Sequence, residues 1–99
     1  MEDIRSVIGN RVKRLRRKIK ISQEELAGRA DLDRTYVTSI ENGRRNVSMV
    51  NIERLALALN CSICEFFSAK EFKTKTMYGR IDDKEKVAKV AEDKKRKYK

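Results

Sequence analysis

Apolar residues recur along the first part of the chain at the spacing of an α-helix. They lie three or four positions apart and therefore share one stripe, as Ile4, Ile8, Val12, Leu15 and Ile19. Every charged residue from position 11 to 20 is basic. The pattern predicts a helix over about residues 4–19 with one apolar and one strongly positive side. The positive side is either a solvated face or a surface that attracts phosphates.

A second, short helix is predicted to begin at Ser22. The hydroxyl of Ser22 can accept hydrogen bonds from free backbone amides, and Glu25 stands three residues further on, as in a capping box. Three small or apolar residues of this helix face inward, namely Leu26, Ala27 and Ala30. Because Asp31 tolerates the left-handed conformation, we expect a tight turn there.

A third helix is expected over residues 34–42, capped by Asp33 and stopped by Gly43. At 100° per residue, Val37 and Ile40 fall on one side of this helix. The opposite side is small, polar and uncharged, with Thr35, Thr38, Ser39 and Asn42. Such a face suits contact with the edges of bases better than it suits mere solvation.

Two further helices complete the pattern, and they begin at Ser48 and Ser62. The first buries Ile52, Leu55, Ala56 and Leu59, with Asn60 as its left-handed stop, and the second carries Ile63, Phe66 and Phe67 as its apolar side chains. The sequence thus predicts an all-α domain of five helices over residues 1–68. Residues 69–99 form a basic C-terminal extension, for which a frayed helix and a disordered tail are both open.

Length and charge narrow the class of protein. Ninety-nine residues with 39% hydrophobic content supply one small core, and proline is absent. The formal charge of +10 predicts a polyanionic partner, nucleic acid or an anionic membrane. No apolar run is long enough to span a bilayer, and the chain starts on Met1, Glu2 and Asp3, where a signal peptide would be basic. We therefore expect a soluble, cytoplasmic protein without a membrane partner.

The sequence holds no set of residues typical of catalysis. It has no histidine and no glycine-rich phosphate loop, so we expect no enzyme, cofactor or small-molecule ligand. Cys61 and Cys64 form a Cys-x-x-Cys pair, which can be a redox pair or half of a zinc site. Without histidine or a third cysteine one chain cannot complete a zinc site, so two unreactive cysteines and no metal are the favoured interpretation.

The segment SQEELAGRADLDRTYVTSIENGRRN resembles the helix-turn-helix of the Cro and phage-repressor family, the xenobiotic-response-element type. The resemblance covers roughly residues 8–67 and depends on Gln23, the small Ala27, the buried Val37 and Ile40, and the closing Glu41-Asn42-Gly43. It implies a repressor-like fold with the motif in helices two and three. Within the family, residues 33–36 followed by Arg44 and Arg45 look most like restriction-modification controller proteins, small dimeric regulators of their own operons.

This resemblance and the geometry of helices in the major groove assign DNA-contacting roles to eleven residues in and just after the motif. Base readers are expected at Arg34, Thr35, Tyr36, Thr38 and Ser39, and Arg34 can give two parallel bonds to guanine. Phosphate contacts are expected from Ser22, Gln23, Asn42, Arg44, Arg45 and Asn46. The family also implies a pairing of Arg16 with Glu41 that holds the third helix at its angle.

A second copy of the chain is the expected protein partner. Five short helices cannot enclose all the apolar residues of the last one, so the predicted dimer interface is Ile63, Cys64, Phe66 and Phe67. Dimerisation would set two reading helices roughly 34 Å apart on a near-palindromic operator in double-stranded DNA. In the fourth helix, Val50 and Leu57 lie opposite the core stripe, so we expect the extension or a partner to cover them.

Three positions depart from the family, which often has glycine where this chain has Lys20, Asp31 and Asn60. A left-handed conformation at Lys20 should cost about 1 kcal/mol relative to glycine. None of the three abolishes the motif.

The main hypothesis is a homodimeric transcriptional regulator, with two alternatives. One is an antitoxin that binds DNA through this domain and neutralises a toxin through its tail. The other is a non-specific nucleic-acid-binding or bridging protein. A tail that folds only on a partner would favour the antitoxin, and equal affinity for all sequences would favour the non-specific binder.

Overall fold

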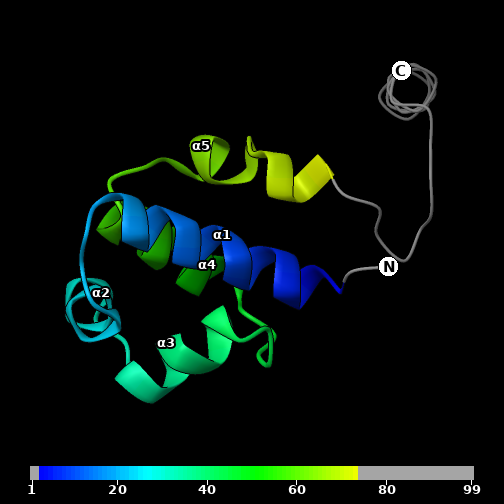
Figure 1. The fold of residues 1–99 in the computed structure, drawn as a ribbon. Coiled ribbons are helices and arrows are strands. Elements are labelled where there is room, and N and C mark those ends of the chain that lie inside the picture. The colour runs from blue at the N-terminus through cyan, green and yellow to red at the C-terminus, as the bar shows by residue number, and fades with distance from the viewer. Residues whose placement is uncertain (1–2, 74–99) are drawn as a thin grey trace, which may run out of the picture.

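The computed structural model describes residues 3–73 as a bundle of short helices without a β-strand in that range (Figure 1). The helices are α1 (Ile4–Lys18), α2 (Gln23–Ala30), α3 (Arg34–Glu41), α4 (Met49–Ala58), α5 (Ile63–Phe67) and the 3-10 helix η1 (Lys70–Lys73). The predicted all-α fold with five helices is confirmed, and each predicted helix boundary agrees to within a residue or so. Predictions about the tail beyond Lys73 fall outside the described residues.

Capping side chains start the helices where the sequence predicted. The side chains of Ser22, Asp33 and Ser48 each accept a hydrogen bond from a backbone amide in the first turn of α2, α3 and α4. The predicted capping box at Ser22 is wrong in one half, because the Glu25 carboxylate accepts from Arg29 one turn further along. A complete capping box does form at the start of α5, between Ser62 and Glu65.

Left-handed residues make the turns between helices. Lys20, Asp31 and Asn60 have φ angles of 59°, 56° and 62°, and Gly43 has 73°. These are the positions at which the sequence predicted a left-handed stop or turn. The Lys20 backbone therefore carries the strain that a glycine there would avoid.

The core lies between α1, α2, α3 and α4. Val12, Leu26, Val37 and Leu55 each contribute a side chain with no exposed surface. Figure 1 shows α1 crossing the molecule, with α3 on one side of it and α5 and η1 on the other. This helix therefore fixes the position of the third helix relative to the fifth.

Gly9 permits the closest approach within this bundle. A Cβ atom at Gly9 would lie 2.3 Å from the carbonyl oxygen of Ile40 and 3.0 Å from that of Glu41. Both atoms belong to the backbone of α3 and cannot rotate away. The absence of a side chain at Gly9 thus allows α1 to pack directly against the end of α3.

Residues 69–73, which the sequence assigned to the C-terminal extension, pack on the domain. Ala69 is buried, and the ring of Phe72 lies 5.0 Å from the ring of Phe67. Glu71 forms an ion pair with Arg14 of α1. The folded body therefore continues at least to the end of η1.

Two apolar residues of α4 lie away from the core, as the sequence predicted. Val50 is 63% exposed and Leu57 is 65% exposed. No part of residues 3–73 covers them, and the expected cover by the tail or a partner stays a prediction. None of the helices in this range is both long and apolar enough to cross a bilayer.

Candidate DNA interface

The outward face of α3 is open. Arg34, Thr35 and Asn42 are exposed, Ser39 is half-buried, and Val37 on the other side is fully buried. Helix α3 begins at Arg34, so the Arg34 side chain stands at the end of the helix that would enter a groove first. The outward face thus offers a guanidinium, a methyl group and small hydroxyl and amide groups, which are the groups that read base edges in the major groove.

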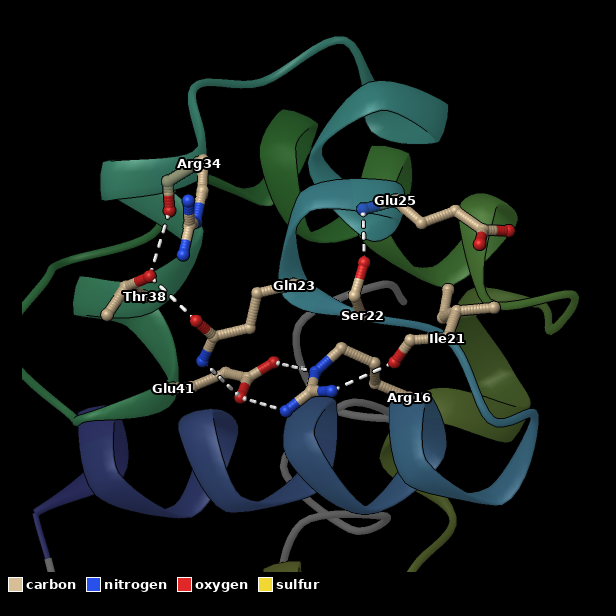
Figure 2. A network of polar contacts seen from close by, with 8 residues as sticks. All are labelled: Arg16, Ile21, Ser22, Gln23, Glu25, Arg34, Thr38 and Glu41. Atoms are coloured by element: carbon tan, nitrogen blue, oxygen red, sulfur yellow. Dashed lines mark hydrogen bonds and ion pairs between the residues drawn. The ribbon is translucent and has the colours of Figure 1, made fainter.

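A buried ion pair holds α3 against α1 (Figure 2). Arg16 donates through Nε to Glu41 Oε2 at 2.7 Å and through a terminal nitrogen to Glu41 Oε1 at 3.0 Å. The Glu41 side chain has no exposed surface, and that of Arg16 is 13% exposed. The bonds to Glu41 raise the pKa of the Arg16 guanidinium above its usual value, against the opposing effect of burial. The pairing that the family resemblance implied is confirmed.

Gln23 extends this ion pair across the helix-turn-helix. Its Nε2 donates to Glu41 Oε1 at 3.0 Å, and its Oε1 accepts from Thr38 Oγ1 at 2.9 Å (Figure 2). The Thr38 hydroxyl also lies 3.0 Å from the backbone oxygen of Arg34. Two predicted DNA contacts, Gln23 and Thr38, are thus half-buried and bonded to each other. Only the methyl group and the free lone pairs of Thr38 remain for a base.

The predicted phosphate contacts lie at both ends of the motif. Ser22 is exposed at the start of α2, where its Oγ accepts from the Glu25 amide at 3.0 Å. After α3, the backbone turns sharply, with the amide of Arg44 donating to the oxygen of Ser39 at 3.0 Å. Three exposed side chains follow Asn42 in this loop, namely Arg44, Arg45 and Asn46. The candidates after α3 therefore share one loop, separate from the start of α2.

Tyr36 is held from two sides by residues outside its helix. Its half-buried ring packs against the core, and the Arg45 guanidinium carbon lies 5.5 Å from the ring centroid. Its hydroxyl oxygen accepts a hydrogen bond from Asn51 Nδ2 in α4 at 3.1 Å. Sequence reasoning missed Asn51, because nothing in the spacing of two residues on different helices indicates that their side chains meet.

The residues predicted for a dimer interface differ in exposure. Cys64 is exposed, and Ile63 and Phe67 are half-buried. The prediction for Phe66 is wrong, because its side chain has no exposed surface and its ring lies between α5 and the rest of the core. Phe72 of η1, 6.0 Å from the Phe66 ring centroid, contributes to this burial.

Arg11 does not belong to the positive outer face that the sequence predicted for α1. The residue is only 7% exposed. Its Nε donates to the Phe66 oxygen and a terminal nitrogen donates to the Glu65 oxygen, both at 2.8 Å. Arg11 thus satisfies the carbonyl groups at the end of α5 and joins that helix to α1.

Both cysteines are free thiols. Cys64 is exposed, and burial raises the pKa of the half-buried Cys61 thiol. Within residues 3–73, no three cysteine, aspartate or glutamate side chains are grouped as they would be around a metal ion.

Comparison with known proteins agrees with this geometry. A helix-turn-helix family model matches residues 12–66, more than half of the chain. The control protein C.MunI of Mycoplasma is 51% identical over 69 residues, which are 69% of this chain and 93% of the relative. The chain belongs to this helix-turn-helix family. The family match spans α2 and α3 and with them every residue predicted to contact DNA.

Solved structures of controller proteins have the same fold. The restriction-modification controller protein C.AhdI from Aeromonas hydrophila matches with a TM-score of 0.62 and 45% identity, over 65% of this chain and 97% of that one. C.Esp1396I, solved as a tetramer with its natural 35 base-pair operator, matches with a TM-score of 0.67 and 30% identity. This match covers 74% of the present chain and 95% of that one.

Proposed function

We propose that this chain is a sequence-specific DNA-binding transcriptional regulator that acts as a homodimer on a near-palindromic operator, as a restriction-modification controller protein. The observation that carries the proposal is the open polar face of α3, fixed against the body by the Arg16–Glu41–Gln23 network. A rigid helix with exposed polar groups can keep its side chains in register with base edges. The operator complex of the related C.Esp1396I supports this assignment.

The exposed and half-buried polar residues of the motif and the loop after it divide into base readers and phosphate anchors. Arg34 is the strongest reader, because its guanidinium can donate two parallel bonds to O6 and N7 of guanine. Thr35 can place its methyl group against that of a thymine, while Ser39 adds an adaptable hydroxyl. The anchors, which fix register on the phosphates, are Ser22, Asn42, Arg44, Arg45 and Asn46.

A homodimer would use the surface of α5. The exposed Cys64 and the half-buried Ile63 and Phe67 remain candidates for contact with a second copy. Two copies related by a two-fold axis would present two α3 helices to half-sites about one turn of DNA apart. Light scattering on the purified chain tests this part, and a monomer at micromolar concentration without DNA would count against it.

Titration of Arg34→Ala tests direct base reading. The probes are the duplex that the wild-type protein enriches from a random pool and a scrambled duplex of the same composition. We expect the variant to lose about 1–3 kcal/mol, roughly 5- to 150-fold, on the enriched duplex, confined to one position in each half-site. Arg29→Ala, an exposed arginine of α2 paired with Glu25, is the matched control for lost charge. An equal loss on both duplexes would remove base reading from the proposal.

The regulatory role has its own test. A controller of its own operon should act in the cytoplasm of the source cell and bind DNA upstream of its own gene. This role requires no catalytic step. Immunoprecipitation of crosslinked DNA locates the occupied sites. Occupied sites that all lie away from its own gene would contradict the controller assignment while leaving sequence-specific binding intact.

A further inference from the structure

Tyr36 is the one predicted base reader whose polar group is fixed by a residue outside the helix-turn-helix. Asn51 Nδ2 donates to the Tyr36 hydroxyl oxygen at 3.1 Å, and both side chains are half-buried. Asn51 itself stands in the first turn of α4, where its amide donates to the capping Ser48 Oγ at 3.1 Å. The donor that faces Tyr36 therefore comes from a well-anchored position.

The direction of this bond determines what the hydroxyl can do next. A phenolic hydroxyl has one proton and two acceptor lone pairs. Because Asn51 donates, one lone pair is occupied and the proton is not used toward Asn51. Among residues 3–73, no acceptor receives the Tyr36 proton. The proton is thus available to a hydrogen-bond acceptor outside the protein.

The Arg45 guanidinium restrains the ring from its face. Its central carbon lies 5.5 Å from the ring centroid, a distance at which a cation is attracted to an aromatic face. Arg45 comes from the exposed loop after α3, so the loop and the ring restrain each other. The Tyr36 side chain of α3 is thus contacted by this loop at its ring and by α4 at its hydroxyl group.

We propose that Asn51 is a positioning residue for DNA recognition, which holds the Tyr36 hydroxyl as a hydrogen-bond donor toward a DNA acceptor. This inference rests on the proposed function and deepens it. The acceptors at base edges that suit such a donor are a purine N7 and the O4 of thymine. Asn51 acts through Tyr36 and contacts no nucleotide itself. Specificity thus extends from α3 into α4.

A double-mutant cycle tests the coupling. The variants are Tyr36→Phe, Asn51→Ala and the two together, each titrated on the duplex enriched by the wild-type protein and on a scrambled duplex. We expect either single substitution to weaken binding to the enriched duplex about threefold to tenfold, the size of one hydrogen bond. The double variant should bind no more weakly than the single variant that has the larger loss. Asn10→Ala, an exposed asparagine of α1, is the matched control and should bind as the wild type does.

Asn51→Asp tests the direction of the bond. An ionised aspartate can only accept, so it would turn the Tyr36 proton inward and remove the outward donor. It also adds a negative charge, which weakens binding to any DNA. When Tyr36 is present, Asn51→Asp should therefore weaken binding to the enriched duplex more than binding to the scrambled duplex. In the Tyr36→Phe background the two losses should be equal, because only the charge effect remains.

Several results would overturn the inference. Losses that multiply in the double variant would show that the two residues act independently. Equal losses by Asn51→Ala on both duplexes, together with a lower Tm, would show a merely structural contact. If the wild type enriches a duplex and Asn51→Ala binds it unchanged, only this inference fails. If the wild type enriches no duplex, the proposed function itself fails.

Discussion

Replacing Glu41 by glutamine removes one charge from the most buried ion pair of the described domain. Glu41 accepts three hydrogen bonds, two from Arg16 and one from Gln23. Glutamine has the same shape, but its NH2 group must face one of these donors. The substitution therefore leaves the Arg16 guanidinium half-buried beside a neutral group and breaks at least one of the three bonds.

The cost follows from the burial of the two side chains. Removing one partner of a buried ion pair destabilises a protein by about 3–5 kcal/mol. Arg16 is still 13% exposed and keeps a bond to the Ile21 oxygen at 2.9 Å, so it is not left wholly without partners. We therefore expect the lower end, about 3 kcal/mol. At about 4–8 °C per kcal/mol for a domain of this size, Tm should fall by about 12–24 °C.

Thermal unfolding followed by circular dichroism measures this loss. The exposed Glu53→Gln in α4 is the matched control and should change stability by less than about 0.5 kcal/mol. Replacing the whole pair, as Arg16→Met with Glu41→Leu, should recover most of the loss, since no charge is then left unpaired. A Glu41→Gln protein that melts within about 3 °C of the wild type would refute the reasoning.

Two further predictions concern the backbone, and a third concerns the cap of α1. Gly9→Ala should destabilise the domain by about 1–3 kcal/mol or more, because its Cβ would lie 2.3 Å from a backbone oxygen of α3. Gly28→Ala, with nothing within 4 Å of the new Cβ, should instead stabilise it by about 0.5–1 kcal/mol, both measured by urea unfolding. Lys20→Gly should raise stability by up to about 1 kcal/mol, because it relieves a φ of 59°. Hydrogen bonds from the Arg5 side chain and backbone lower the pKa of Asp3 to about 2, so its carboxyl group should titrate there by NMR. This cap should stabilise α1 above the ordinary pKa of 3.8 and lose its effect as the pH falls toward 2.

Each of these has a contrary result. Equal stabilities for the two alanine variants would contradict the close approach of α1 to α3. A loss of stability in Lys20→Gly would mean that glycine's extra freedom in the unfolded chain outweighs the strain at that turn. For Asp3, Arg5→Ala is the control that should return the pKa toward 3.8, and a wild-type midpoint already at that value would exclude the cap.

Local chemistry accounts for what the sequence predicted well. Helix starts at Ser22, Asp33 and Ser48 need only a side-chain oxygen next to free amides, and such a signal is complete within four residues. Asp31 and Asn60 tolerate the left-handed conformation for an equally local reason. The open face of α3 followed from helix geometry, once Val37 was assigned to the core.

Contacts between distant segments account for what the sequence did not predict. Phe66 is buried in the core, and Phe72 of η1, a helix that shows no periodic pattern of its own, contributes to that burial. A basic run predicted an outward side chain for Arg11, whereas the free carbonyl groups at the end of α5 draw it inward. The bond between Tyr36 and Asn51 requires the packing of α3 beside α4, which spacing along the chain does not encode.

Selection of duplexes from a random pool, run in parallel with the wild type and with Arg34→Ala, tests the central claim most directly. The claim is that the exposed face of α3 reads base edges. The account predicts that the wild type enriches two matching half-sites about one turn of DNA apart, and that the variant loses preference at a single position in each. A wild-type pool without any enriched sequence, or the same full motif from both proteins, would contradict it.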